Sequence, residues 1–163
     1  MNKSIQDAMN DQINKELYSS YLYLSMAAFL EEKNLPGFAH WMRIQETEER
    51  EHAMKFYDYM VERGGRVTLK AIDAPKTEWK STLELAEEVA AHEAMVTASI
   101  YTLYELAFKE KDYPTQIMLQ WFISEQVEEE KNAAEIVSNL KLIEDRGTAV
   151  LMLDHRLAKR GGE

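Results

Sequence analysis

Four long stretches of the chain contain neither glycine nor proline, and this feature limits the possible folds most strongly. They cover residues 4–35, 38–63, 76–113 and 115–146. Each stretch is rich in Ala, Leu, Met, Glu and Lys, which favour helix. The pattern predicts four helices, at about residues 3–33, 37–63, 81–110 and 113–144, all longer than usual. A short fifth helix is expected at about residues 148–159.

The breaks between these helices predict the topology. Short breaks at residues 34–37 and 111–114 join the helices into two antiparallel hairpins. The link between the hairpins, residues 65–80, is longer and can span roughly 53 Å when extended. A helix of about 28 residues is only about 42 Å long. The link can therefore run along the whole bundle, so the second and third helices are expected to be parallel. Ser81 and Glu84 form a capping-box pattern at the start of the third helix.

The composition excludes several classes of protein. The chain has no cysteine, which removes disulfides, zinc fingers, thiolate iron–sulfur sites and cysteine nucleophiles. Its 29 acidic and 19 basic residues give a net charge of −10, which argues against nucleic-acid or anionic-lipid partners. No apolar run is long enough to span a membrane, and residues 1–12 lack a signal-peptide core. A cytoplasmic location is the default expectation.

Polar residues interrupt the predicted core row of every helix. Alternating steps of three and four residues select the positions that face a bundle core, and most of these are apolar. The exceptions near the middle of the rows are Glu16, Gln45, Glu49, His52, Glu93, Gln126 and Glu129. A buried carboxylate without a partner costs several kcal/mol. A cation is therefore expected among these residues.

The spacing of these polar residues repeats along the chain. The sequence separation between Glu16 and Glu49 equals the separation between Glu93 and Gln126. One constant shift in residue number relates two sets, in which Glu16, Glu49 and His52 correspond to Glu93, Gln126 and Glu129. The chain thus resembles two copies of one hairpin related by a pseudo-twofold axis. All four helices are predicted to present polar side chains at one level of the core.

The side-chain chemistry of this layer favours iron or manganese among redox-active metals, because oxygen ligands dominate and imidazole is scarce. Di-iron carboxylate bundles use single glutamates from two helices and a Glu-x-x-His motif from each of the others. Glu16 and Glu93 fit the single positions, and Glu49 with His52 forms one Glu-x-x-His motif. The fourth helix departs from this pattern, because Glu129 stands where the second histidine would be.

Four stretches carry a resemblance to a known family: LYSSYLYLSM at 17–26, GFAHWM at 37–42, ERGGRV at 62–67 and EQVEEE at 125–130. Through them the chain resembles the bacterial and archaeal non-haem ferritins over nearly its whole length. The resemblance implies an all-α, ferritin-like four-helix bundle, with one long crossover and a short C-terminal helix, in a single domain over residues 1–163. It also implies a homo-oligomeric cage of 24 subunits. Such a cage oxidises Fe(II) with oxygen or hydrogen peroxide and stores ferric oxyhydroxide.

The resemblance also assigns roles to single residues. Glu16, Glu49 and His52 would form iron site A. Glu49, Glu93 and Glu129 would form site B, with Gln126 nearby. A third iron site on the inner-cavity side would use Glu48, Glu125 and Glu128, although acidic runs on exposed helix faces also occur without metal. Tyr23 and Trp121 match aromatic residues beside the centre, where they act in the chemistry or only fill the core.

Several departures narrow the choice within the superfamily. The second Glu-x-x-His motif of bacterioferritins is absent, and Arg50 stands where they have a haem-ligating methionine, which argues against haem. A DNA-protecting mini-ferritin would lack the fifth helix, and a rubrerythrin-type peroxidase would contain Cys-x-x-Cys. A di-iron oxidase or peroxidase without mineral storage remains the alternative function. His40, His92 and His155 lie outside the core rows and are expected at the surface or an interface.

Overall fold

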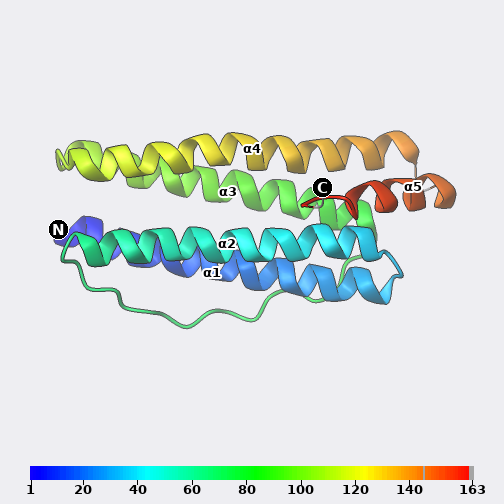
Figure 1. The fold of residues 1–163 in the computed structure, drawn as a ribbon, viewed down its shortest axis with the longest axis horizontal. Coiled ribbons are helices and arrows are strands. Elements are labelled where there is room, and N and C mark those ends of the chain that lie inside the picture. The colour runs from blue at the N-terminus through cyan, green and yellow to red at the C-terminus, as the bar shows by residue number, and fades with distance from the viewer. Residues whose placement is uncertain (145, 162–163) are drawn as a thin grey trace.

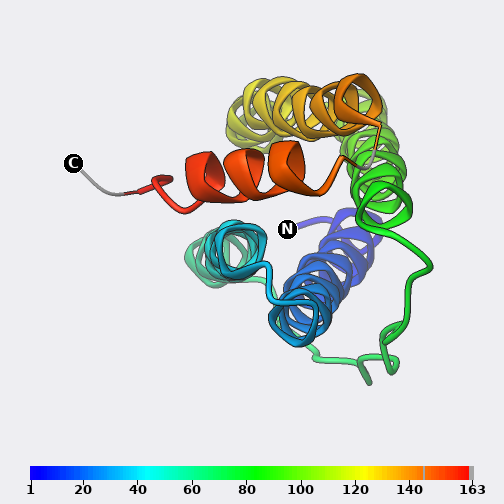
Figure 2. The same cartoon turned by 90° about the vertical axis from the view of Figure 1, so that its right-hand side faces the viewer.

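The structure is a computed structural model that describes residues 1–144 and 146–161. It contains α1 (Lys3–Glu32), α2 (Pro36–Glu62), α3 (Thr82–Lys109), α4 (Tyr113–Ile143) and α5 (Gly147–Leu157). No strand occurs within the described residues. The four long helices lie side by side, and the short α5 crosses one end of the bundle (Figures 1 and 2). The predicted all-α bundle with a short fifth helix is confirmed.

Local hydrogen bonds explain where the helices begin. Asn2 and Asp112 each accept a backbone hydrogen bond at the start of α1 and α4, as N-cap residues do. Ser81 Oγ accepts from the backbone N–H of Glu84 at 3.0 Å, which is one bond of the predicted capping box. The return bond differs, because the Glu84 carboxylate accepts from the N–H of Lys80 instead of that of Ser81.

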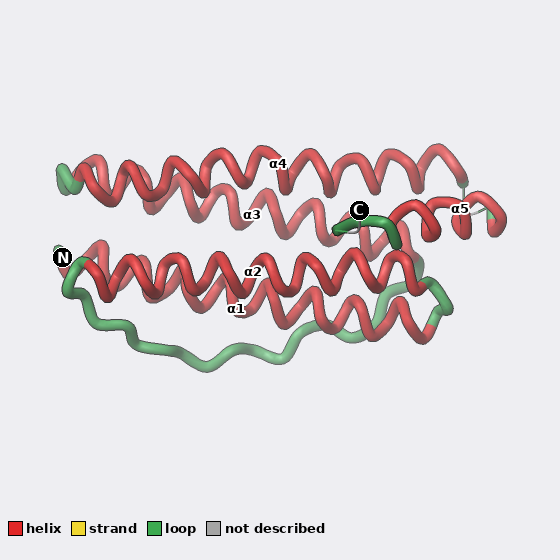
Figure 3. The backbone as a smooth tube through the Cα atoms, in the orientation of Figure 1, coloured by secondary structure: helices red, strands yellow, loops and turns green. Residues whose placement is uncertain are grey.

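The segment between α2 and α3 runs along the bundle from one end to the other (Figures 1 and 3). It makes α2 and α3 parallel, as the length of the link predicted. Polar side chains of α1 hold it in place. Asn10 donates to the carbonyl of Arg66 at 3.1 Å and accepts from the N–H of Thr68 at 2.7 Å. Ser25 donates to the carbonyl of Lys76 at 2.7 Å. These bonds pair backbone groups of a segment that lacks secondary structure of its own.

A polar layer divides the core into two hydrophobic clusters. One cluster includes Leu30 and Phe38 near α5, and the other includes Ile5 and Phe56 near the N-terminus. The four predicted core rows run from Met9 to Leu30, from Phe38 to Tyr59, from Ala86 to Ala107 and from Leu119 to Leu140. All their residues are buried except Tyr59, which is half-buried. The interrupting residues Glu16, Gln45, Glu49, His52, Glu93, Gln126 and Glu129 are all buried between the clusters. The sequence pattern therefore located both the core and its polar layer.

The short helix α5 docks on the beginning of α2. The backbone N–H of Phe38 donates to Asp154 Oδ1 at 2.9 Å, and this places a carboxylate at the positive end of the α2 dipole. Gly37 permits the approach, because a Cβ there would lie 1.8 Å from the carbonyl oxygen of Asp154. Leu153 is buried in the core cluster beside it. In the described part of the chain, no helix is long and apolar enough to cross a membrane.

Candidate metal centre

Three predicted ligands from α1 and α2 come together in the polar layer. Glu16, Glu49 and His52 each offer one ligand atom, and these atoms lie within 4.8 Å of one another. His52 Nδ1 lies 3.7 Å from Glu49 Oε2, one helical turn away. The three side chains are at most 5% exposed. Within the described residues, no other trio of acidic or histidine side chains comes this close.

Two carboxylate oxygens of this trio lack a hydrogen-bond partner. Gln12 Nε2 donates to Glu16 Oε1 at 2.8 Å. Glu16 Oε2 and Glu49 Oε2 are buried, and no donor within the described residues pairs with them. An unsatisfied buried acceptor costs about 1–3 kcal/mol. A metal ion would remove this cost, so the donor set fits a hard or borderline divalent cation.

The polar side chains of α3 and α4 lie at the same level but are held by their neighbours. Glu93 accepts from the hydroxyl of Tyr23 through Oε1 and from Gln126 Nε2 through Oε2, the latter at 3.2 Å. Glu129 Oε2 accepts from Gln45 Nε2 at 2.8 Å. The structure thus brings Glu93 and Gln126 together across two helices. It does not bring Glu93 and Glu129 into one close ligand group with Glu49.

Burial raises the pKa of every carboxyl group in this layer. The pKa of Glu16 lies well above its usual value because of burial and then the charge of Glu49. Burial also raises the pKa of Glu49 well above its usual value, and the charge of Glu93 raises it further. For Glu93, burial raises the pKa and the hydrogen bond from Tyr23 opposes the rise. Burial and the charge of Glu93 raise the pKa of Glu129 to about 7. Metal binding would therefore release protons.

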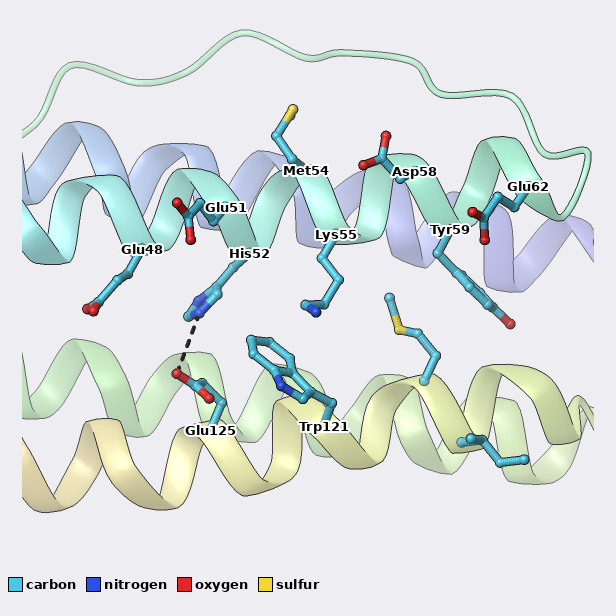
Figure 4. Close-up of a pocket in the computed structure, with 12 residues that line it drawn as sticks. Glu48, Glu51, His52, Met54, Lys55, Asp58, Tyr59, Glu62, Trp121 and Glu125 are labelled. Atoms are coloured by element: carbon cyan, nitrogen blue, oxygen red, sulfur yellow. Dashed lines mark ion pairs between the residues drawn. The ribbon is translucent and has the colours of Figure 1, made fainter.

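A cavity of about 840 Å³ lies between α2 and α4, and the otherwise buried His52 forms part of its wall (Figure 4). Glu48 and Glu125 line it from opposite helices, and His52 Nε2 lies 3.9 Å from Glu125 Oε1. Both glutamates are half-buried. Glu128, the remaining predicted ligand of the third site, is exposed and lies outside the lining of this cavity.

The two predicted aromatic residues lie beside the polar layer on different sides. Tyr23 is fully buried and contacts Glu93, and burial raises its pKa well above the usual value. Trp121 packs edge-on against His52, with ring centroids 5.4 Å apart. The Nζ atom of Lys55 lies 4.0 Å from the centre of the Trp121 ring, at the wall of the cavity.

One histidine lies where the sequence did not place it. His92 is only 8% exposed, so its assignment to the surface was wrong. Its Nε2 lies 2.7 Å from Ser19 Oγ, and its ring packs against Tyr18 and Tyr23. Burial lowers the pKa of His92. The error arose because α3 buries a stripe wider than one row of residues. His40 and His155 are exposed, as expected.

Two glutamines contact the predicted ligands but were not predicted to be ligands themselves. Gln12 bonds Glu16 and Gln45 bonds Glu129. Gln12 precedes Glu16 by about one helical turn, so helical spacing was the available signal. Gln45 belongs to a core row, but its partner lies across the bundle on α4, and no sequence spacing identifies such a contact.

Comparisons with known proteins agree with this fold. Residues 6–143 match the Ferritin-like domain family. A bacterial non-heme ferritin from Staphylococcus saprophyticus is 42% identical over 160 residues, which are 98% of this chain and 96% of that protein. One from Bacteroides fragilis is 41% identical and covers 98% and 99%. An open-pore ferritin structure from the archaeon Archaeoglobus fulgidus is 48% identical, with a TM-score of 0.97 over 98% and 99%. The chain therefore belongs to the ferritin family.

Proposed function

We propose that the protein stores iron and oxidises Fe(II) to Fe(III) within each subunit. The observation that carries this proposal is the trio of Glu16, Glu49 and His52, buried between two hydrophobic clusters with two unpaired carboxylate oxygens. A purely structural role does not account for such a costly arrangement. Iron is the substrate and the cargo here, and the subunits are proposed to form a cytoplasmic cage of 24 copies.

The first Fe(II) ion is proposed to bind Glu16, Glu49 and His52, because these ligands already lie close together. Its charge stabilises the ionised carboxylates, whose pKa values burial has raised. Protons leave as the ion binds. The His52 nitrogen nearer Glu49 is Nδ1, so the neutral ring would coordinate the ion through that atom.

The second Fe(II) ion is proposed to use Glu93 and Glu129, with Glu49 bridging and Gln126 nearby. These carboxylates first have to release or share hydrogen bonds from Gln126 and Gln45. The second ion should therefore bind more weakly than the first. This order of filling follows from the contacts of the side chains and does not require a difference in ligand type.

Oxidation needs an acceptor for the two electrons that the two Fe(II) ions lose. Hydrogen peroxide takes two electrons and two protons and becomes two molecules of water. Oxygen takes the same number and becomes hydrogen peroxide. The protein contributes a buried site that orients the ions, and the hydroxyl of Tyr23 fixes Glu93.

The oxidised product is proposed to leave toward the cavity between α2 and α4. Glu48 and Glu125 line this cavity and, with the exposed Glu128 outside its lining, would form a third iron site; further acidic residues such as Glu51 line the same cavity. Assembly into a homo-oligomer would cover large apolar side chains that the single chain exposes. They include Phe108, Ile117, Val127, Leu142 and Met152.

The site assignment is tested with the double variant Glu49→Ala/His52→Ala. We expect rapid Fe(II) oxidation, followed as absorbance of the ferric product in stopped flow, to be lost. Glu105→Ala is the matched control, because Glu105 is an exposed acidic residue on α3. Oxidation by the double variant at the wild-type rate would refute the assignment.

An aerobic Fe(II) titration with particle-size measurement distinguishes iron storage from the activity of a di-iron oxidase or peroxidase that keeps no mineral. A large particle that retains its iron through gel filtration supports storage. A small oligomer that turns over Fe(II) and releases the product would favour the alternative activity.

A further inference from the structure

The short turn after α5 returns to α2 and carries one arginine to Glu48, a residue that lines the cavity. Arg160 is the third residue after the end of α5 at Leu157. The backbone carbonyl of Arg160 lies 2.9 Å from His40 Nε2, which anchors the turn on α2. The docking of Asp154 on the first turn of α2 fixes α5 itself. The position of Arg160 is therefore set by the backbone and not only by its side chain.

The guanidinium of Arg160 contacts two further residues of α2. It lies over the ring of Trp41, with Cζ 4.5 Å from the ring centre. Its Nη2 donates to Glu48 Oε2 at 2.7 Å. His40, Trp41 and Glu48 share one face of the helix, because seven or eight residues make about two turns. One cation is thus held beside a carboxylate of the proposed third iron site.

The guanidinium of Arg160 uses only one of its two terminal amino groups in the ion pair with Glu48. Its Nη1 is buried, and no acceptor in the described residues pairs with it. An arginine that serves only to bind a carboxylate usually forms two parallel bonds. Here one amino group binds Glu48 and the other is unsatisfied. Release of the side chain would let water satisfy Nη1, so displacement costs less than for a fully paired arginine.

The electrostatics point in the same direction. Glu48 and Glu125 line the same cavity, so two carboxylates repel each other across it when no metal is present. Arg160 is the basic residue that pairs with Glu48. Arg156, one turn earlier, pairs instead with the exposed Glu135 on α4. The two arginines of this segment therefore differ in their partners.

We propose that Arg160 is a built-in counter-cation of Glu48, which iron displaces when it binds the third site. This inference rests on the proposed third site and adds its regulation. The guanidinium lowers the affinity of the third site relative to the buried site. Iron then fills Glu16, Glu49 and His52 first and reaches Glu48 when the supply is high or when oxidised product moves toward the cavity between α2 and α4.

The test is a calorimetric titration of the assembled, metal-free protein with Zn(II), a redox-inert divalent cation. Wild type should show tight binding and a weaker class that Glu48→Gln removes. Arg160→Ala should tighten the weaker class by roughly tenfold and leave the tight class unchanged. Arg160→Lys retains a charge without a planar group and should fall between wild type and Arg160→Ala. Arg156→Ala is the matched control and should bind Zn(II) as wild type does.

The outcomes separate the inference from the proposal on which it rests. If Glu48→Gln removes no ion, the third site itself is refuted and the role of Arg160 with it. If Glu48→Gln removes an ion but Arg160→Ala leaves its affinity unchanged, only the role of Arg160 is refuted. Equal tightening in Arg156→Ala would show a general charge effect and would also overturn the inference. Thermal melts of each variant verify that the bundle is intact.

Discussion

Gln12 Nε2 donates a 2.8 Å hydrogen bond to one oxygen of Glu16, and the other oxygen of that carboxylate is buried without a partner in the described chain. This bond is the last of a series of hydrogen bonds that all run in one direction. Lys15 Nζ donates to Ser99 Oγ at 2.5 Å, and Ser99 donates to Gln12 Oε1 at 2.6 Å. Because lysine is only a donor, each following group is set as acceptor and then donor. This series of hydrogen bonds orients Glu16 and leaves its Oε2 atom available to a metal ion.

Gln12→Met should slow Fe(II) oxidation while leaving the fold intact. Methionine has a similar length but cannot donate to Glu16, so this carboxylate loses its orientation. Loss of such a supporting bond typically costs about 10–100-fold in metal affinity or activity. The initial rate of oxidation at low Fe(II) concentration measures the effect. Gln120→Met, at an exposed position on α4, is the control and should match wild type. Equal rates for both variants would show that Gln12 does not orient Glu16.

Tyr23→Phe should weaken metal binding at Glu93 in a manner that depends on pH. The hydroxyl of Tyr23 donates to Glu93 and lowers the pKa of that carboxyl group. Without it the pKa of Glu93 rises further, so protons compete better with metal at lower pH. Zn(II) affinity should therefore fall more at pH 6.5 than at pH 8.5. Tyr101→Phe, at an exposed site on α3, provides the comparison. A loss of affinity that is independent of pH would contradict this account.

The level of the polar layer was predictable because helical periodicity and the internal repeat both act along the chain. Every interrupting residue of the four core rows is buried where the pattern placed it. The partners of these residues were not predictable in the same way. Gln45 and Tyr23 contact Glu129 and Glu93 across the bundle, so their contacts depend on rotamers and interhelical distances.

The repeat also conceals an asymmetry that only the structure shows. The shift that relates Glu16 to Glu93 also relates Gln45 to Phe122 and Tyr23 to Ile100. Ligand positions therefore repeat, whereas their hydrogen-bond donors do not. This explains why Glu16, Glu49 and His52 form a close group while Glu93 and Glu129 are bound to neighbouring side chains. A similar limit applies to His92, whose burial depends on how deeply α3 sits against α1.

The metal-free protein should lose stability as pH rises through the raised pKa of Glu129. The folded pKa is about 7 and the ordinary value is 4.5, so the folded state holds more protons between these values. Stability from this group is complete below pH 4.5 and is lost as pH increases to about 7. Glu129→Gln removes the titration. The metal-free variant should match wild type near pH 4.5 and exceed it by up to roughly 3 kcal/mol above pH 7.

Denaturant unfolding of chelator-treated protein at several pH values measures this difference. Zn(II) should reverse the order at pH 7.5, because wild type gains binding energy from the ionised Glu129 and the variant does not. If the wild type were the more stable protein at pH 7.5 without metal, Glu129 would not carry the cost assigned to it.

Gly37→Ala should release α5 from the bundle. A Cβ at this position would lie 1.8 Å from the carbonyl oxygen and 2.9 Å from Cγ of Asp154, and the first of these atoms is backbone that cannot move alone. The bond between Asp154 and the N–H of Phe38 would break as α5 shifts, which removes a charged cap from α2. We expect a loss of at least about 2 kcal/mol, because strain and a lost cap act together. Gly147→Ala tests the opposite case at the start of α5, since a Cβ there meets nothing within 4 Å. It should be neutral or slightly stabilising, because alanine favours helix more than glycine does.

Thermal melts and limited trypsin cleavage at Arg156 and Lys159 report the docking of α5. Equal melting temperatures for the two variants would show that the close approach of Gly37 and Asp154 is not what holds α5 on α2.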